Sequence, residues 1–407
     1  MIERSVSDVL ARAVSAGELD VRPILEAVRA RGDAAVAEYA QRFGDPRPRR
    51  IDRSEFEAAY RECSEELRGA LAGAAERIAR FARAQRDAIL DVSLREGNLE
   101  LGHQAVPLER VGIYVPSGRH PLPSSLLMGA IPAQIAEVRE RIVCTPRAGR
   151  EVLAAAYIAN VTSVLEIGGA QAIAALAYGT QTIARVDCIV GPGNAFVTAA
   201  KRAVFGVCGI DALAGPSEIT IVASSDADPD LVAADLLAQA EHDDEARALL
   251  VTDDRAFAQA VSACAAARLA TLPTQETARS SMMKHGGYVV LALDDAPAFC
   301  DRLAPEHLSL QGKRAQELAG QCTVYGTLFV GSGAAEVFGD YGSGPNHVLP
   351  TGGTARFSSG LSVLNFLTFR TYERSLGNVD RRIANDAAIL AEAEGLYAHR
   401  EAALARR

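Results

Sequence analysis

The sequence predicts an α/β protein in which two doubly wound α/β units follow a helical N-terminal region and precede a small helical tail. Three observations predict this. From about residue 110 to residue 292, short β-rich segments alternate with Ala-rich helical segments. The β-rich segments are almost continuously apolar, which is typical of parallel strands covered on both faces. The chain has 407 residues, enough for two or three units of roughly 150 residues each.

The N-terminal region, residues 1–110, is expected to be mainly helical and to pack with the second α/β unit. Between Val21 and Gly44, apolar side chains recur about every 3.6 residues, the period of an α-helix. The sequence Arg42-Phe43-Gly44 is typical of the end of a helix.

The first α/β unit is expected over residues 111–222 and the second over residues 223–355. The strands expected in the first unit are Val111–Val115, Arg141–Cys144, Val164–Ile167, Cys188–Val190 and Glu218–Val222. The second unit is expected to contain a helix at Pro229–Asp243, a strand at Ala248–Thr252, a helix after Asp254 and a strand at Tyr288–Ala292. No strand is expected after about Gly352, and residues 356–407 are expected to form the helical tail.

Composition and charge exclude several classes of function. The net charge is −9, and no stretch carries five consecutive basic residues, which disfavours binding to nucleic acid or to anionic membranes. The N-terminus lacks the features of a signal peptide, and no apolar run reaches the roughly 18 residues of a membrane span. The seven cysteines are scattered, as is typical of free thiols in a reducing compartment. We therefore expect a cytoplasmic protein.

Two Gly-rich segments are candidate nucleotide-binding turns. The turn Gly191-Pro192-Gly193-Asn194 follows an expected strand and begins a helix, where backbone amides suit a phosphate or a nicotinamide amide; a plain turn is equally compatible. The segment Gly331-Ser332-Gly333 has Glu336 where the dinucleotide fingerprint needs a third glycine. The two units are therefore interpreted as Rossmann-like but incomplete.

Two groups of polar residues are candidates for metal binding or catalysis. Asp235, Gln239 and His242 lie on one stripe of the expected helix, which is either a ligand set or a solvated face. Glu306 and His307 place a carboxylate beside an imidazole, the usual general base near neutral pH, although a surface pair is also possible.

Further candidates lie near the C-terminus. The loop Asp340–His347 is dense in Gly and polar residues, and such loops often carry function. Glu394 and His399, in the tail, resemble surface helix residues. Zn²⁺ accepts donors of the kinds found in Gln239, His242, Asp340 and His399, but their spacing alone does not bring them together.

Long ordered segments of the chain resemble histidinol dehydrogenases over nearly the whole length. The matching segments are Arg110–Pro116, Gly168–Ala177, Ile189–Ala195, Ala214–Glu218, Ala233–His242, Ala304–Leu308, Gly339–Tyr341, Asn346–Thr351 and Glu394–His399. The resemblance implies oxidation of L-histidinol to L-histidine, through the aldehyde, in two NAD-dependent hydride transfers. It also implies one Zn²⁺ per subunit, which positions the substrate.

The resemblance implies the following site residues. Zinc would be held by Gln239, His242, Asp340 and His399. The substrate would be bound by these four together with Ser217, His307, His347 and Glu394. NAD would contact Tyr114, Gln171 and Asn194. His307 would act as the base and Glu306 would activate water. The family also implies a homodimer with shared active sites, in which the tail supplies Glu394 and His399 to the other subunit.

One departure from the family pattern follows Pro116. Where the family usually has Gly-Gly and small residues, this chain has Ser117-Gly118-Arg119-His120. This is either loop variation or the mark of a paralogous zinc- and NAD-dependent dehydrogenase that acts on another small polar primary alcohol.

Overall fold

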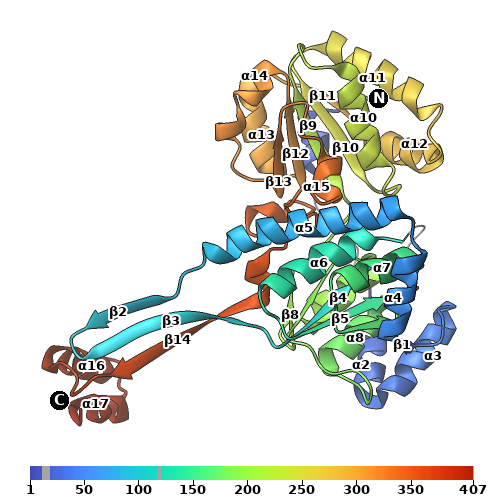
Figure 1. The fold of residues 1–407 in the computed structure, drawn as a ribbon. Coiled ribbons are helices and arrows are strands. Elements are labelled where there is room, and N and C mark those ends of the chain that lie inside the picture. Colours follow the sequence, from blue (N-terminus) through green and yellow to red (C-terminus); the bar gives the residue numbers. More distant parts are fainter. Residues whose placement is uncertain (12–18, 118–120, 407) are drawn as a thin grey trace.

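The computed structural model describes residues 1–11, 19–117 and 121–406. Figure 1 shows two α/β units, one above the other, and an arm that extends away from the lower one and ends in the C-terminus. Within the described ranges, no helix is long and apolar enough to cross a membrane.

The first α/β unit is built on a six-stranded sheet. In spatial order its strands are β1 (Arg49–Ile51), β6 (Ser163–Glu166), β5 (Glu140–Thr145), β4 (Arg110–Tyr114), β7 (Cys188–Val190) and β8 (Gly209–Ile210). All neighbouring pairs are parallel except β1 with β6. The helices whose apolar sides cover its two faces are α6 (Pro123–Ile135) and α7 (Arg150–Ile158) on one, and α8 (Gly169–Tyr178) and α9 (Ala195–Val204) on the other.

The expectation that residues 1–110 pack with the second unit is wrong for most of this region. Its longer helices bury their apolar stripes in the two cores of the first unit. They are α2 (Arg22–Arg31) and α3 (Asp33–Phe43) against α8, α4 (Arg53–Glu62) against α7, and α5 (Glu65–Asp87) against α6. The first residues join the second unit, where α1 (Val6–Ala11) contacts α13 (Ala296–Leu303) and Glu3 bridges Tyr288. Arg77 of α5 also donates a hydrogen bond to the carbonyl oxygen of Gly342.

The second unit is built on a five-stranded parallel sheet. In spatial order its strands are β11 (Gly287–Val290), β10 (Arg247–Thr252), β9 (Glu218–Ala223), β12 (His307–Gln311) and β13 (Thr327–Val330). One face is covered by α10 (Pro229–Ala240), α11 (Arg255–Leu269) and α12 (Gln275–Lys284), and the other by α13 (Ala296–Leu303) and α14 (Lys313–Gln316).

The predicted boundary between the units, after residue 222, is wrong. Strand β9 was expected to end the first unit, but it is the central strand of the second sheet. It pairs with β10 on one side and β12 on the other, and all six of its residues are buried. The edge strand of the first sheet is β8, and β9 pairs with no strand of that sheet.

The arm is a three-stranded antiparallel sheet that carries two helices at its tip (Figure 1). Its strands are β2 (Val92–Glu96), β3 (Leu99–Pro107) and β14 (Leu367–Ser375), and its helices are α16 (Arg381–Ala393) and α17 (Tyr397–Leu404). The prediction of no strand after Gly352 is therefore wrong. Most residues of β14 are at least partly exposed, so this strand lacks the apolar run by which a buried strand is recognised.

Candidate active site

The candidate catalytic residues lie at the amino ends of strands in the second sheet, beside the junction with the first unit. His307 is the first residue of β12, and Ser217 directly precedes β9. Ligands of open α/β sheets usually bind at the carboxyl ends of strands. The candidate nucleotide-binding turn of the first unit follows this rule, because it lies after the carboxyl end of β7. The second unit departs from this rule.

Glu306 and His307 are buried together, which the sequence alone left open. The Nδ1 atom of His307 lies 3.6 Å from Oε2 of Glu306 and 3.0 Å from the carbonyl oxygen of Glu218. Since a carbonyl only accepts, this bond assigns the proton to Nδ1 and leaves Nε2 as the basic nitrogen. Burial lowers the pKa of His307 to about 4, so the ring is neutral near pH 7.

Two hydrogen bonds fix the Glu306 carboxyl group. Its Oε2 atom accepts from the Ser217 hydroxyl at 2.7 Å and from the Glu218 amide at 2.8 Å. Burial raises the pKa of Glu306 well above its usual value, although both hydrogen bonds oppose the shift. Ser217, Glu306 and His307 thus form one connected group.

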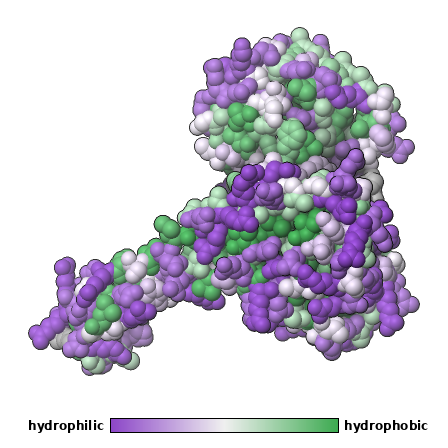
Figure 2. All heavy atoms as spheres, in the orientation of Figure 1, coloured by the Kyte–Doolittle hydropathy of each residue, from purple (hydrophilic) through white to green (hydrophobic). Residues whose placement is uncertain are grey.

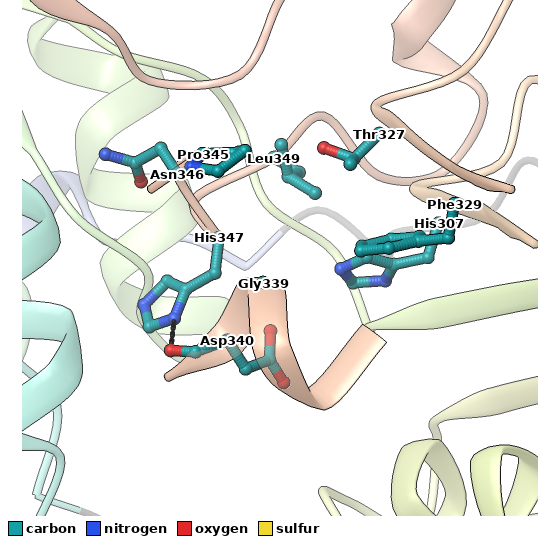
Figure 3. A pocket seen from close by; sticks show the side chains of 9 residues that line it. All are labelled: His307, Thr327, Phe329, Gly339, Asp340, Pro345, Asn346, His347 and Leu349. Atoms are coloured by element: carbon teal, nitrogen blue, oxygen red, sulfur yellow. Dashed lines mark hydrogen bonds between the residues drawn. The ribbon is translucent and has the colours of Figure 1, made fainter. Parts of the chain in front are cut away.

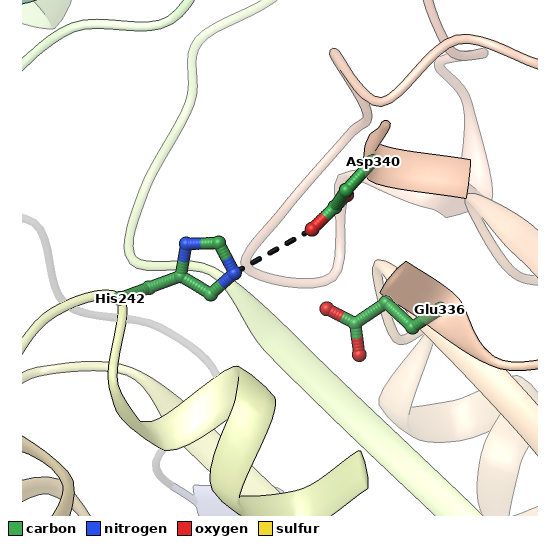
Figure 4. Close-up of side chains that lie close together, drawn as sticks. All are labelled: His242, Glu336 and Asp340. Atoms are coloured by element: carbon green, nitrogen blue, oxygen red, sulfur yellow. Dashed lines mark ion pairs between the residues drawn. The ribbon is translucent and has the colours of Figure 1, made fainter. Parts of the chain in front are cut away.

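A cluster of possible metal ligands lies beside this group (Figure 4). Within the described part of the chain, His242, Glu336 and Asp340 place one ligand atom each within 4.8 Å of one another. His242 Nε2 is 3.5 Å from Asp340 Oδ2. The hydrogen bond to Asp340 raises the pKa of His242, whereas the pKa of Asp340 is lowered because its interactions with histidines outweigh its burial.

Glu336 is the residue that sequence reasoning missed. It begins the short helix α15 (Glu336–Asp340), so it stands one helical turn from Asp340, and that i, i+4 spacing was the available signal. Its carboxylate lies 3.7 Å from His307 Nδ1. Burial raises the pKa of Glu336 well above its usual value, and the neighbouring carboxylates add to the shift.

Gln239 lies in the last turn of α10 and is completely buried. Neither its amide oxygen nor its amide nitrogen has a hydrogen-bond partner among the described residues. The predicted polar stripe is interrupted, because α10 ends at Ala240 and His242 lies beyond its end. Asp235 turns elsewhere and accepts a 2.7 Å hydrogen bond from Gln311.

The loop Asp340–His347 connects this cluster to the first unit. The His347 Nδ1 atom bonds the carbonyl oxygen of Asp340 at 2.9 Å, and its Nε2 atom lies 3.2 Å from the hydroxyl of Ser125 in α6. In Figure 3, His307, Asp340 and His347 surround one small pocket, which Phe329 also lines. The predicted loop therefore contributes four residues, Asp340, Pro345, Asn346 and His347, to the pocket that contains His307.

The candidate cofactor contacts lie in the first unit. Tyr114 ends β4, and its hydroxyl accepts a hydrogen bond from the Gly169 amide at 3.1 Å. Gln171, two residues further on, is buried, and its amide oxygen has no partner within the described residues. Asn194 follows the parallel strand β7 and caps α9, accepting from the Phe196 and Val197 amides. Tyr114 and Asn194 thus lie at or just beyond the carboxyl ends of two neighbouring parallel strands, and Gln171 follows the glycine that bonds Tyr114.

Comparison with known proteins identifies the family. The family model described as histidinol dehydrogenase matches residues 11–407. The chain belongs to the histidinol dehydrogenase family. It is 48% identical over 386 residues to histidinol dehydrogenase 1 of Nostoc sp. strain PCC 7120, covering 93% of this chain and 89% of that protein. It is 46% identical over 385 residues to the Caulobacter vibrioides enzyme, covering 93% and 90%.

A solved histidinol dehydrogenase confirms the fold. The crystal structure of the Elizabethkingia anophelis enzyme matches with a TM-score of 0.92 at 32% identity, covering 100% of this chain and 97% of that one. The α/β fold with parallel sheets is thus shown, and the chain is a zinc- and NAD-dependent oxidoreductase of histidine biosynthesis, as in this family.

The structure fits the two cofactors of the histidinol dehydrogenase family. Gln239 offers two buried amide atoms that lack partners among the described residues, and it lies three positions before His242, which pairs with Asp340; all three are donor types that zinc accepts. Gln171 likewise offers a free, buried amide oxygen at the nicotinamide cofactor's expected position.

Two predicted site residues lie elsewhere in the single chain. Glu394 directly follows α16 and His399 lies in α17, and both are exposed at the tip of the arm, which Figure 1 shows remote from α15. Of the departure from the family pattern after Pro116, Gly118, Arg119 and His120 lie outside the described residues.

Proposed function

We propose that this chain oxidises L-histidinol to L-histidine in two NAD-dependent hydride transfers, in active sites that two subunits share. The observation that carries the proposal is the buried group of Ser217, Glu306 and His307 beside the His242–Asp340 cluster. It places a base and a water-activating carboxyl group next to a site for a metal that holds the substrate.

His307 is the general base of the first step. Its Nδ1 proton is committed to the Glu218 carbonyl, so Nε2 can take the proton of the substrate hydroxyl while the carbon gives its hydride to NAD⁺. The products of this step are the aldehyde, NADH and a proton on His307.

Glu306 serves the second step. The aldehyde must add water before it can lose another hydride, and a carboxylate whose pKa is raised by burial is a better proton acceptor than an ordinary one. Glu306 takes one proton from the attacking water while the protonated His307 returns its proton to the aldehyde oxygen, which gives the hydrate and restores His307 as a base. His307 then takes a proton from the hydrate as the second hydride leaves to a second NAD⁺. The product is the carboxylic acid of histidine, and loss of its proton to solvent gives the carboxylate.

Zinc would be held by Gln239, His242 and Asp340 of one subunit together with the partner subunit's His399. When bound, it supplies a Lewis acid that fixes the substrate through nitrogen donors. The substrate would also be surrounded by Ser217 and His347 of the same subunit and by the partner subunit's Glu394. NAD would contact Tyr114, Gln171 and Asn194.

The arm supports the proposed homodimer. It carries Glu394 and His399 away from its own cluster, and apolar side chains lie exposed on its surface among hydrophilic ones (Figure 2). These include Leu94, Ile389, Leu390 and Tyr397. Exposed apolar residues on an extended element are typical of an interface with another chain.

The cysteines support a cytoplasmic location. All seven are free, and six of them are buried. An oxidising compartment would favour disulfides, and none is needed to hold these cores together.

The stoichiometry of NADH formation tests the proposed reaction. The zinc-loaded enzyme is expected to form two NADH for each L-histidinol consumed, and one NADH for each L-histidinal supplied in its place. One NADH per histidinol would contradict the two-step reaction. Slow turnover at high KM for histidinol, with fast turnover of another polar primary alcohol, would instead favour a paralogue.

A further inference from the structure

A buried ion pair lies directly beneath the turn that follows β7. Lys201 in α9 and Asp211 after β8 pair through their side chains, each of which is 3% exposed. Ion pairs at this depth contribute little net stability, because desolvating both charges costs about as much as their attraction returns. The pair therefore calls for an explanation other than stability.

Both charges act on one residue, Gly191. Its amide donates to Asp211 Oδ2 at 2.7 Å, and its carbonyl oxygen accepts from Lys201 Nζ at 3.0 Å. Asp211 Oδ1 also accepts from the Ala212 amide at 2.6 Å. The strand β7 ends at Val190, so neither polar group of Gly191 belongs to the sheet ladder. The ion pair thus fixes both polar groups of Gly191.

Gly191 tolerates little displacement. Its φ angle is +110°, which favours glycine, and a Cβ atom there would lie 2.1 Å from the carbonyl oxygen of Tyr114. The turn is therefore packed against Tyr114 on one side and leads on the other into Asn194. These are two of the three residues assigned to NAD.

A lysine suits the two acceptors at this position better than an arginine would. Lys201 is one of three lysines among 42 basic residues in the chain, the rest being arginines. A compact ammonium can donate to a carboxylate and a carbonyl oxygen in different directions from one point, whereas a guanidinium is planar and larger. At this buried position the compact cation satisfies both acceptors.

We infer that Lys201 and Asp211 are positioning residues for the nicotinamide cofactor: together they hold the turn Gly191–Asn194 at the distance from Tyr114 that NAD requires. This rests on the proposed NAD contacts. The ion pair itself touches no substrate, and its effect reaches the reaction only through the backbone of the turn.

The test uses two variants of the full-length, zinc-loaded enzyme. Lys201→Met removes the ammonium, and the double variant Lys201→Met/Asp211→Asn also removes the carboxylate charge that would otherwise be left buried and unpaired. Both are expected to raise the KM for NAD by about tenfold or more, equivalent to about 1.4 kcal/mol of binding. The KM for histidinol and the zinc content are expected to stay near the wild-type values.

Val204→Ala is the matched control for stability. Val204 is buried in the same helix but makes no bond to the turn, so truncating it should lower the thermal midpoint without raising the KM for NAD. The double variant should recover stability relative to Lys201→Met but keep the raised KM for NAD. A double variant that folds and has the wild-type KM for NAD would overturn the inference. The inference would also be overturned if Val204→Ala raised the KM for NAD as it lowered the thermal midpoint.

Gln171→Ala, measured in parallel, separates this inference from the proposed function. If Gln171→Ala raises the KM for NAD and neither Lys201 variant does, the inference alone is wrong. If none of these variants changes the KM for NAD, both the inference and the proposed cofactor site are wrong. If the KM for NAD rises in the Lys201 variants but not in Gln171→Ala, the result supports the positioning role and contradicts the contact assigned to Gln171.

Discussion

Replacing His307 with asparagine is expected to lower kcat for histidinol oxidation by about 100-fold to 10,000-fold, the usual contribution of a general base. Asparagine can keep the hydrogen bond to the Glu218 carbonyl but offers no basic nitrogen. Because His307 is not among the proposed zinc ligands, the zinc content measured by atomic absorption should remain near that of the wild type.

The matched control is His285→Asn. His285 directly follows α12 and pairs with Glu245 at 3.0 Å, and neither residue belongs to the proposed site, so replacing His285 should leave kcat within about twofold. Turnover by His307→Asn at the wild-type rate would show that another group accepts the proton. Loss of zinc from His307→Asn would instead reassign this residue to the metal.

Replacing Gln239 with leucine is expected to change zinc binding and stability in opposite directions. Leucine has a similar volume and removes two buried amide atoms that lack partners among the described residues. The free energy of unfolding of the zinc-free protein should therefore rise by about 1 to 3 kcal/mol. Zinc affinity should fall by about 100-fold or more, since a ligand matters at least as much as the groups that orient ligands.

Gln311→Leu provides the comparison. Gln311 is also a buried glutamine whose amide oxygen lacks a partner among the described residues, but its amide nitrogen donates to Asp235 at 2.7 Å. The same substitution therefore leaves a half-buried carboxylate without that partner. It should lower the stability of the zinc-free protein and leave zinc binding largely intact. Denaturant unfolding without zinc and competition titration with zinc measure both quantities. A destabilised Gln239→Leu protein with unchanged zinc affinity would remove Gln239 from the ligand set.

Much of the fold follows from local patterns. The expected strands of the first sheet other than Glu218–Val222 coincide with β4 to β7, because apolar runs between helices mark strands buried on both faces. The assignment of β9 failed because an apolar run does not reveal which sheet a strand joins. The N-terminal helices were placed against the wrong unit for a similar reason: an amphipathic stripe shows that a helix is buried, but not against what.

The candidate site was predictable only where residues are close in the chain. Glu306 and His307 are adjacent, and Asp340 and His347 share one loop, whereas Ser217 joins them through pairing between β9 and β12. Strand pairing joins residues far apart in the chain, so local sequence patterns do not reveal it. The resemblance to the family supplied the remaining association, and Glu336 emerged only once α15 placed it beside Asp340.

Glu336 also defines the main alternative to the shared site. Catalytic zinc sites often have three protein ligands and keep a position open for the substrate, and a single chain could offer Glu336, His242 and Asp340 as those three. The proposed set instead takes His399 from the partner subunit. The ligand set with Glu336 needs only one chain, whereas the proposed set needs two.

Co-expression of two inactive variants tests the shared site most directly. In a heterodimer of His307→Asn and His399→Asn subunits, a shared arrangement pairs one intact cluster with one intact tail, so one of two sites works. Random pairing should then restore about one quarter of the wild-type activity, as expected for a two-fold symmetric dimer. If each chain completes its own site, every site in the mixture carries a defect, and activity no higher than that of the separate variants would contradict the account.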